Sequence, residues 1–534
     1  MMTKASIVVL AVAALSRGSA AQDPAGLTGT ATFVVTQAGD TLAVERVTRT
    51  SARVESDLAV RGQGVRMQFS LDLTPQALVS SMEIAVRLAG ATPDAPPAQA
   101  ATLAFRGDSV IAELTAPART TQRFAVGTGA LPFVNLSMAV TEQLVRRARA
   151  LGGRRAEVPM FVVGGGQVMR AVVTWSAADT AVISLGGVDL RASISPDGRL
   201  LGAHVPSQNV RFARVDGSAS VALTTAPPDY SAPADAPYSA EEVIVLSTGG
   251  LRLAGTLTLP KQRGRDGRAP AVVLITGSGP QNRDEELPGM KGYRFFRQVA
   301  DTLSRRGIAV LRLDDRGIGG SEAGDRPGTS GDFADDVRAA LAYLRSRPEI
   351  RGDRLGLVGH SEGALIAPMV ARDDPQLRAI ALLAAPSRTI RRILAFQRRV
   401  LVENDTAIPV AKRDSALAAL ARRADSVAAT PGWLQYVYDY DPLATARQVR
   451  TPVLILHGAT DLQVTADQVP ELATAFREGG NRDVTVHVIP NTNHLFLEDP
   501  SGVYSGYAGL PSKTVKPEVL GRLADWLVGK LGRT

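Results

Sequence analysis

Residues 359–363 read Gly-His-Ser-Glu-Gly and match the G-x-S-x-G pattern that surrounds a serine nucleophile. The apolar run Leu355–Val358 comes directly before this pattern, and a helical stretch, Ala364–Ala371, follows it. A serine on so sharp a strand-to-helix turn has its hydroxyl held clear of the sheet, and the helix N-terminus favours developing negative charge. This context predicts that Ser361 is a nucleophile. The other residues of its predicted elbow are Gly359, His360 and Gly363.

A serine hydroxyl is a poor nucleophile unless a neighbouring base, itself oriented by a carboxylate, activates it. In a strand–turn–helix arrangement of this kind the partners follow in the order Ser, Asp, His, each after a later strand. The predicted strand Val453–Leu456 leads into Asp461, and the predicted strand Val484–Ile489 leads into His494. We therefore expect Asp461 to be the acid and His494 the base. Asp467 is near enough in sequence to serve as the acid instead.

Elimination among the histidines also points to His494. The chain has five of them, His204, His360, His457, His487 and His494. One lies in the N-terminal half, one within a predicted strand and one in the elbow. His457 precedes the acid at the end of a strand, a place more typical of a packed structural residue.

Acyl transfer by a serine needs two N–H donors for the oxyanion of the tetrahedral intermediate. One expected donor is the backbone of Glu362, the residue after the nucleophile. The other is expected from the Gly-rich loop 276–280, where Ser278 and Gly279 are the candidates. The loop lacks the lysine and the glycine spacing of phosphate-binding loops.

Residues 240–534 contain apolar runs of five to seven residues that alternate with helical stretches. This pattern predicts an α/β domain, a mostly parallel sheet with helices on both faces, whose sites lie at the carboxyl ends of the strands. A mostly helical segment at about 388–440 is too long for a simple crossover and is expected to form a cap. The aromatic residues of this cap are Trp433, Tyr436, Tyr438 and Tyr440. They are more typical of core packing than of an acyl pocket.

The part of the chain before residue 240 has a different character. Residues 22–226 alternate polar and apolar positions between Gly/Asp turns, which predicts a mainly antiparallel β domain with one helix at about Val134–Ala150. Four prolines in 227–239 indicate a linker. Residues 1–21 have the charge, apolar stretch and small residues of a secretory signal peptide, so an exported protein, periplasmic or secreted, is expected.

Five segments together carry a family resemblance: Gly277–Glu285, Asp314–Ser321, Gly359–Gly363, Asp461–Val464 and Asn493–Phe496. With them, the second half resembles the α/β-hydrolase core of bacterial serine esterases that have a β-rich N-terminal domain. This group is related to the prolyl oligopeptidase and serine aminopeptidase-like hydrolases. The resemblance implies hydrolysis of carboxylic esters with short acyl chains, through an acyl-enzyme and without a cofactor. Asn282 stands where the family pattern has an aspartate.

Composition excludes several other classes. The chain is 45% hydrophobic and 21% charged, as in a soluble globular protein, so stable membrane insertion is not expected. Its formal charge of +8 is spread along the sequence, whereas nucleic-acid binding favours a clustered basic patch. The absence of cysteine excludes disulfides, thiolate metal sites and a cysteine nucleophile. The histidines are too scattered for a metal site, so no metal and no cofactor are expected, only a small-molecule ester substrate.

Three other functions remain open from the sequence. A serine peptidase or a thioesterase would use the same three residues. An oligopeptidase of this type would carry the repeated blades of a propeller, and an aminopeptidase would need carboxylates for the substrate's amino group, whereas the cap is basic. A binding protein with an inactive hydrolase fold would have little reason to keep a strained elbow that lowers stability.

Overall fold

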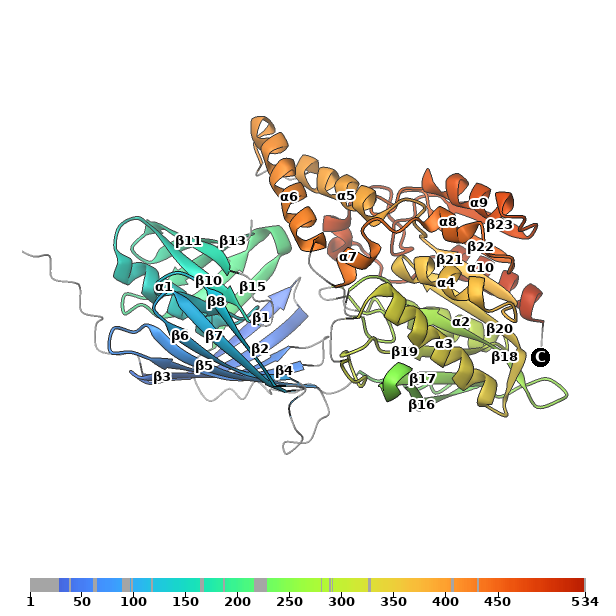
Figure 1. The fold of residues 1–534 in the computed structure, drawn as a ribbon, viewed down its shortest axis with the longest axis horizontal. Helices are drawn as coiled ribbons and strands as arrows, with labels where there is room; N and C mark the ends of the chain where they lie inside the picture. Colours follow the sequence, from blue (N-terminus) through green and yellow to red (C-terminus); the bar gives the residue numbers. More distant parts are fainter. Residues whose placement is uncertain are drawn as a thin grey trace, which may run out of the picture.

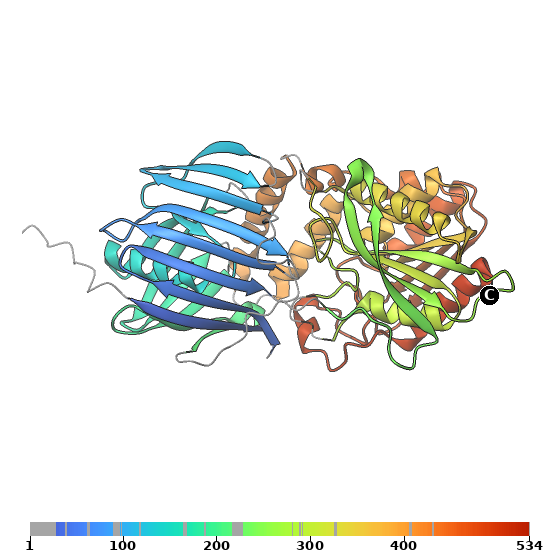
Figure 2. The ribbon, with the colours of Figure 1, turned by 90° about the horizontal axis from the view of Figure 1, so that it is seen from below.

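The computed structural model describes residues 28–532, except 38–39, 61–64, 89–96, 98, 117–118, 164–167, 186–187, 216–227, 280, 288–289, 291, 325–327, 405–407 and 430–431. The predicted signal peptide, residues 1–21, lies outside the described residues. Two separate sheets organise the described chain, and Figures 1 and 2 show them side by side. No helix within this part of the chain is long and apolar enough to cross a bilayer.

The N-terminal domain is one sheet of fifteen strands in the order β8-β7-β6-β5-β4-β3-β2-β1-β15-β14-β13-β12-β11-β10-β9, antiparallel except for the pair β9–β10. The strands are β1 (Gly29–Gln37), β2 (Asp40–Arg49), β3 (Arg53–Val60), β4 (Val65–Leu73), β5 (Val79–Leu88), β6 (Gln99–Arg106), β7 (Ser109–Ala116), β8 (Thr120–Ala125), β9 (Leu131–Phe133), β10 (Arg155–Val162), β11 (Val168–Ala177), β12 (Thr180–Leu185), β13 (Val188–Ile194), β14 (Leu200–Val205) and β15 (Val210–Val215). In β1 the buried positions alternate, at Ala31, Phe33 and Val35, as a sheet with one buried face requires. The predicted antiparallel β domain is confirmed.

This sheet curls around the helix α1 (Met138–Leu151), which lies between the layer β1–β8 and the layer β9–β15 (Figures 1 and 2). The buried side chains of both layers and of the helix form one hydrophobic core. The helix begins later than the sequence pattern suggested because the Ser137 side chain accepts the N–H of Val140 and caps it there.

A buried carboxylate fixes the start of α1. Glu45 of β2 accepts the hydroxyls of Ser56 and Ser137, both at 2.6 Å, and its other oxygen accepts the N–H groups of Met138 and Ala139. Burial raises the pKa of Glu45, although these four hydrogen bonds oppose the shift. The helix N-terminus is therefore tied to β2 by a group that has no contact with water.

Replacing Glu45 by alanine should destabilise the N-terminal domain by about 3–5 kcal/mol. The change leaves two hydroxyls and two backbone N–H groups buried without their acceptor. Each such group costs about 1–3 kcal/mol, and water that enters the space left by the side chain relieves part of this cost. Urea unfolding followed by circular dichroism measures the loss. Glu55→Ala, an exposed position on β3, is the matched control and should change stability by less than about 0.5 kcal/mol. Equal midpoints for the two variants would contradict the role of Glu45.

The C-terminal domain is a sheet of eight strands in the order β16-β17-β19-β18-β20-β21-β22-β23. The first two pairings, β16–β17 and β17–β19, are antiparallel and all later ones are parallel. The strands are β16 (Tyr238–Leu246), β17 (Arg252–Pro260), β18 (Ala269–Ile275), β19 (Ala309–Leu313), β20 (Ile350–His360), β21 (Ala379–Leu383), β22 (Val453–Gly458) and β23 (Val484–Ile489). The central strands are buried throughout, which explains their continuous apolar runs.

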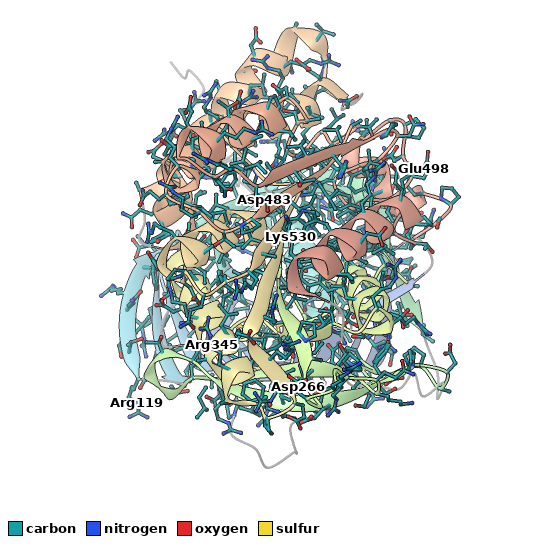
Figure 3. All side chains as sticks on the ribbon, turned by 90° about the vertical axis from the view of Figure 1, so that its right-hand side faces the viewer. Arg119, Asp266, Arg345, Asp483, Glu498 and Lys530 are labelled. Carbon is teal, nitrogen blue, oxygen red and sulfur yellow. The ribbon has the colours of Figure 1, made fainter. Side chains whose placement is uncertain are left out.

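Helices cover both faces of this sheet. One face packs on α3 (Ser330–Ser346), α4 (Glu362–Asp373), α8 (Pro442–Ala446) and α9 (Gln468–Glu478), and the other on α2 (Phe295–Arg305) and α10 (Pro517–Leu531). The predicted α/β-hydrolase core is confirmed by this arrangement. Near the end of α10, Lys530 pairs with Asp483, just before β23 (Figure 3), so this helix holds the last strand of the sheet.

The predicted cap between β21 and β22 is helical. It contains α5 (Ile390–Asn404), α6 (Arg413–Ala428) and α7 (Trp433–Val437), and Figure 1 shows α5 and α6 extending from the core on the side of the N-terminal domain. Arg391 pairs with Asp439 at 2.7 Å and stacks 4.2 Å above the Tyr438 ring. These contacts join the start of α5 to the segment that follows α7.

The proline-rich segment before β16 is docked on the C-terminal domain. The carbonyl of Asp229 accepts hydrogen bonds from Arg294 and Arg297, at 2.8 and 2.6 Å. The next residue, Tyr230, lies 4.2 Å from the guanidinium of Arg283. The described part of the predicted linker is therefore fixed and does not act as a free spacer.

Candidate active site

Ser361 occupies a strained turn between β20 and α4. Its φ of +52° and ψ of −111° lie outside the regions that non-glycine residues favour. Its N–H donates to the Leu383 carbonyl at 2.8 Å. A Cβ on Gly359 would lie 2.1 Å from the Gly363 carbonyl oxygen, and one on Gly363 would lie 2.0 Å from that of Ile275. Both glycines are required because the neighbouring backbone leaves no room for a side chain.

Asp461 and His494 come together at the carboxyl ends of β22 and β23. The distance from His494 Nδ1 to Asp461 Oδ2 is 2.7 Å, and both side chains are buried. The other oxygen of Asp461 accepts the N–H groups of Gln463 and Val464, at 2.8 and 2.9 Å. Since a carboxylate only accepts, Nδ1 of His494 carries the proton and Nε2 is left as the basic nitrogen.

Asp461 remains ionised at neutral pH. Burial alone would raise its pKa, but the nearby charge of His494 and the hydrogen bond to it outweigh burial and lower the pKa below its ordinary value. Asp467, the alternative acid, lies at the start of α9 and pairs with Arg388 at 2.6 Å. The structure thus places Asp461 against His494 and Asp467 in an ion pair elsewhere.

His457 supports the loop that carries the acid. It is fully buried, its Nε2 donates to the Val464 carbonyl at 2.8 Å, and it lies 3.5 Å from Asp461 Oδ2. Burial lowers the pKa of His457, so the ring is neutral and acts as a hydrogen-bond donor.

The Gly-rich loop lies against the nucleophile. A Cβ on Gly277 would lie 3.4 Å from the Cβ of Ser361, and the Gly277 N–H is already donated to Glu285 Oε1 at 2.8 Å. Gly277 is therefore not available to an oxyanion, which leaves the predicted candidates Ser278 and Gly279. Asp315 accepts the Thr276 hydroxyl at 2.7 Å and the N–H of Gln281 at 3.0 Å, and so braces both ends of the loop. Burial raises its pKa well above the ordinary range.

His360 joins this loop to the loop of the predicted base. Its Nδ1 lies 2.8 Å from Glu285 Oε1, and its Nε2 lies 3.0 Å from the backbone carbonyl of His494. Both neighbours are acceptors, so a protonated His360 satisfies both. Burial opposes this charge, but the Glu285 carboxylate and the His494 carbonyl outweigh it and raise the pKa of His360. The ring also packs edge-on to Phe295, with 5.0 Å between ring centroids.

Sequence reasoning treated His360 only as part of the elbow and Glu285 only as part of a motif. The contact of Glu285 with the Gly-rich loop could have been predicted, because an acid at the end of such a loop can accept hydrogen bonds from its backbone amides. Its φ of +55° and its burial mark a residue held against its backbone preference. Nothing in the local pattern, however, links positions 75 residues apart in sequence.

The side chain of Glu362 connects the nucleophile helix to the cap. Its Oε1 accepts the Ser330 hydroxyl at 2.5 Å and the indole N–H of Trp433 at 2.6 Å. Burial raises the pKa of Glu362, and the two hydrogen bonds oppose the shift. Trp433 of the cap is thus in direct contact with Glu362, the residue that follows Ser361.

Asn282 has a structural role in the same loop. Its side-chain oxygen accepts the N–H groups of Asp284 and Glu286, both at 3.1 Å, and its amide donates to the Glu286 carboxylate at 2.8 Å. The departure from the family pattern leaves the turn intact. Across the described ranges, no cluster of three histidine, aspartate or glutamate side chains could hold a metal ion.

Comparisons with known proteins find similarity to a family of serine hydrolases and to several enzymes. Residues 289–501 match the family described as serine aminopeptidase, S33. The chain is 28% identical to esterase EstD of Thermotoga maritima over 312 residues, which is 56% of this chain and 70% of EstD. It is 23% identical to dipeptidyl-peptidase 5 of Porphyromonas gingivalis, over 49% of this chain and 36% of that protein. The Pyrococcus furiosus esterase Pf2001 superposes with 18% identity and a TM-score of 0.40, over 57% of this chain and 98% of that one.

The chain therefore carries a hydrolase domain of the α/β-hydrolase type, related to bacterial esterases and to serine aminopeptidase-like enzymes. It spans about a third of the peptidase that it matches. The predicted resemblance is confirmed.

The stabilisation supplied by His360 should depend on pH. Its folded-state pKa is raised above the ordinary value of about 6.5, so its contribution is complete below that pH and is lost as the pH rises through the folded-state pKa. The difference in unfolding free energy between wild type and His360→Gln should therefore shrink from about pH 5 to about pH 9, by about 1.4 kcal/mol for each unit of pKa shift.

His487→Gln is the matched control for urea titrations at several pH values. His487 lies on β23, and burial lowers its pKa, so its contribution has the opposite pH dependence. A His360 effect that stays constant across this range would contradict an ionised pair with Glu285.

Proposed function

We propose that this protein is a carboxylesterase in which Ser361, Asp461 and His494 act as a catalytic triad. The proposal rests on two observations, the 2.7 Å contact between His494 Nδ1 and Asp461 and the positive φ of Ser361 on a glycine-flanked turn. The residue before this serine, His360, contacts the backbone carbonyl of His494 at 3.0 Å. That arrangement provides a base with the correct tautomer and a partly exposed serine on a strained turn, which are what nucleophilic acyl transfer requires.

In the first half of the reaction the Ser361 oxygen attacks the ester carbonyl carbon, and its proton passes to His494 Nε2. Asp461 stabilises the imidazolium that forms. The negative charge on the carbonyl oxygen is stabilised by the N–H of Glu362, at the N-terminus of α4, and by that of Ser278 or Gly279. Breaking the C–O bond then releases the alcohol, which takes the proton from His494 and leaves an acyl-serine.

In the second half a water molecule attacks the acyl-serine. His494 accepts a proton from the water, and the tetrahedral intermediate uses the same two N–H donors. When it breaks down, the carboxylic acid leaves and Ser361 recovers its proton from His494. Besides the ester and one water molecule, every group in this cycle is a side chain or a backbone N–H of the protein.

A serine peptidase is the second candidate, because the matching family and one of the relatives carry peptidase names. Binding an amino terminus would need an ionised carboxylate near the nucleophile. Asp315 and Glu362 lie near it, but burial raises the pKa of both, and their oxygens already accept hydrogen bonds from the protein. The carboxylate of Glu285 also lies close by, but it is already paired with His360 and accepts the N–H of Gly277. This electrostatic character favours an ester over a peptide with a charged amino group.

Ser361→Ala should lower kcat for p-nitrophenyl acetate by about 10⁴ to 10⁶-fold, since it removes the nucleophile. Asp461→Asn should lower kcat by about 10⁴-fold, because an amide stabilises neither the tautomer nor the imidazolium. Asp467→Asn is the matched control and should leave kcat within about twofold, since Asp467 pairs with Arg388 away from the base.

The same assays with p-nitroanilides of amino acids separate the two candidates. Turnover of esters with little turnover of anilides supports the esterase. Faster turnover of anilides would favour the peptidase over the esterase. An active Ser361→Ala variant would refute the assignment of Ser361 as the nucleophile.

The preference for short acyl chains depends in this proposal on the cap. Trp433 is held against Glu362, so its ring limits the space next to the acylated serine. Trp433→Ala should raise the ratio of kcat/KM for p-nitrophenyl octanoate to that for the acetate by about tenfold, since each methylene accommodated is worth a several-fold gain. Gln435→Ala, an exposed residue of the same helix, is the control. An unchanged ratio in both variants would place the acyl pocket elsewhere.

A further inference from the structure

The N-terminal domain contains an apolar cavity of about 210 Å³ between α1 and the inner face of strands β9–β15. The helix contributes Val140 and Leu144 to its wall, and the facing strands contribute Ile183 and Leu190. None of the described residues that line it carries a charge. The cavity belongs to the domain without the catalytic residues and has no part in the chemistry proposed above.

Buried polar contacts prevent α1 from closing this space. Glu142 of the helix accepts a hydrogen bond from Arg49 at 3.1 Å and from the backbone N–H of Leu200 at 2.9 Å. Gln143 accepts from Arg49 at 2.9 Å and donates to the Ala77 carbonyl at 2.6 Å. Moving the helix further onto the facing strands would break its bonds to Arg49 and Ala77, which lie in the other layer, and such buried bonds are costly to leave unmade. The bond from Leu200 of β14 holds the helix from the opposite side, so its position is fixed from both layers. The cavity is therefore part of the fold and not a gap that side chains could fill by relaxation.

An apolar cavity that stays open is unfavourable in proportion to its volume unless a ligand fills it. Water fits it poorly, because a buried water needs two to four polar partners. The hydroxyl of Thr141 is bonded to the Ser137 carbonyl, and that of Ser137 is bonded to Glu45. An engineered apolar cavity of about 150 Å³ remains dry and binds benzene, so 210 Å³ is enough for a short hydrocarbon chain.

The entrance has a different character from the interior. Asn135 and Gln208 line the same cavity but are exposed, and two other lining residues, Val188 and Met169, are only partly buried. The site thus offers an apolar interior and neutral amide groups at its mouth. This combination matches a molecule with a hydrocarbon chain and a polar head that stays in water.

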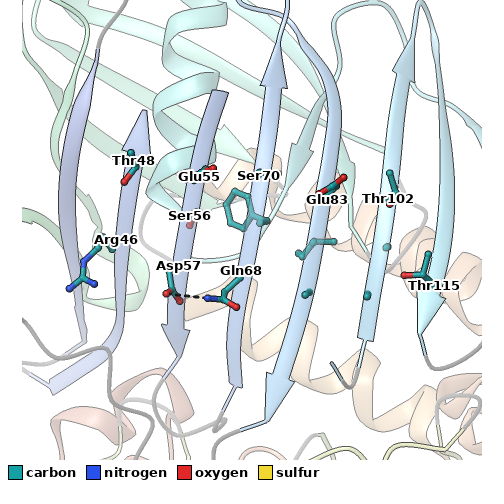
Figure 4. A pocket seen from close by; sticks show the side chains of 15 residues that line it. Arg46, Thr48, Glu55, Ser56, Asp57, Gln68, Ser70, Glu83, Thr102 and Thr115 are labelled. Atoms are coloured by element: carbon teal, nitrogen blue, oxygen red, sulfur yellow. Dashed lines mark hydrogen bonds between the residues drawn. The ribbon is translucent and has the colours of Figure 1, made fainter. Parts of the chain in front are cut away.

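The second hollow of the same domain makes a clear contrast. It measures about 560 Å³ and is lined by polar side chains of β2–β7, such as Glu55, Asp57 and Gln68 (Figure 4). Glu55 pairs with Arg53 and Asp57 with Arg66. Two of the carboxylates there, Glu55 and Asp57, thus already have basic partners, whereas no charged residue is among the described residues that line the apolar cavity.

We propose that the cavity between α1 and strands β9–β15 is a binding site for the aliphatic chain of a medium-chain fatty acid. The chain lies between Val140, Leu144 and Ile183, and the carboxyl group remains at the mouth beside Asn135 and Gln208. This site is independent of the hydrolase site and would exist whether or not the C-terminal domain cleaves esters.

The test is calorimetric titration of sodium decanoate into the full-length Ser361→Ala protein, in which no hydrolysis contributes heat. Saturable binding is expected. Ile183→Phe extends a side chain into the cavity from β12. Each buried methylene is worth roughly a fourfold change in affinity, so displacing two of them should weaken binding by about tenfold or more.

Val182→Phe is the matched control, since it adds a similar ring on the same strand but on the opposite face of the sheet. It should leave the affinity for decanoate within about twofold. Circular dichroism shows whether each variant is folded. If Ile183→Phe does not fold, Val188→Phe repeats the test, because it narrows the mouth of the cavity at a partly exposed position.

Loss of binding in Ile183→Phe or Val188→Phe, with binding retained in Val182→Phe, supports the site. Undiminished binding in both cavity variants would assign decanoate to the acyl pocket of the hydrolase domain and overturn the proposal. Absence of saturable binding in the parent protein would overturn it as well. Neither result bears on ester hydrolysis, which is measured separately with Ser361 present.

Discussion

Three loops meet at the buried pair of His360 and Glu285, and the geometry of the active site depends on that meeting. Glu285 holds the N–H of Gly277 in the Gly-rich loop, and His360 holds the carbonyl of His494. His360 also precedes the nucleophile directly in sequence. This buried pair thus ties together the Gly-rich loop, the turn that carries Ser361 and the loop that carries His494. An ion pair this deeply buried is a weak source of net stability, but breaking it by removing one partner is costly.

A second layer of buried charge lies behind the first and fixes the segment that supplies Glu285. Arg283 makes a two-point contact with Asp314, at 2.8 and 3.1 Å, and Arg312 pairs with Asp284. Burial lowers the pKa of Arg312 to about 10, which still leaves it charged at neutral pH. Tyr230 of the docked segment covers Arg283. The family motifs around residues 283 and 314 therefore bind each other and together hold the segment that carries Glu285.

The sequence was informative wherever a residue's position follows from the end of a strand. Asp461 and His494 could be chosen because each follows a short apolar run, and parallel strands bring their carboxyl ends to one edge of a sheet. The roles of Glu285 and of the Glu362 side chain could not be found in this way. They depend on how loops fold back over the sheet, and on contacts such as Glu362 with Trp433 that join the core to a cap 71 residues away.

In the N-terminal domain, the sequence predicted the strands but not how they are ordered in the sheet. Alternation of polar and apolar residues predicted its strands, but the single sheet of fifteen strands depends on β1 pairing with β15, a contact between the two ends of the domain. The start of α1 depended on a cap at Ser137 that the apolar pattern of the helix does not reveal. Glu45 and Glu142 read as ordinary acids on a strand and a helix until the fold buries them.

The two domains use the same physical device for different ends. In each, apolar packing brings elements together without fixing their exact separation, because the hydrophobic effect has no preferred direction. Hydrogen-bonded charges do have a preferred geometry, and their burial makes any departure from it expensive. In the C-terminal domain, Glu285 and His360 use this property to hold together the three loops around Ser361 and His494. In the N-terminal domain, Glu45 and Glu142 fix the position of α1 between the two layers, and the apolar cavity beside this helix is the site that we propose for an acyl chain.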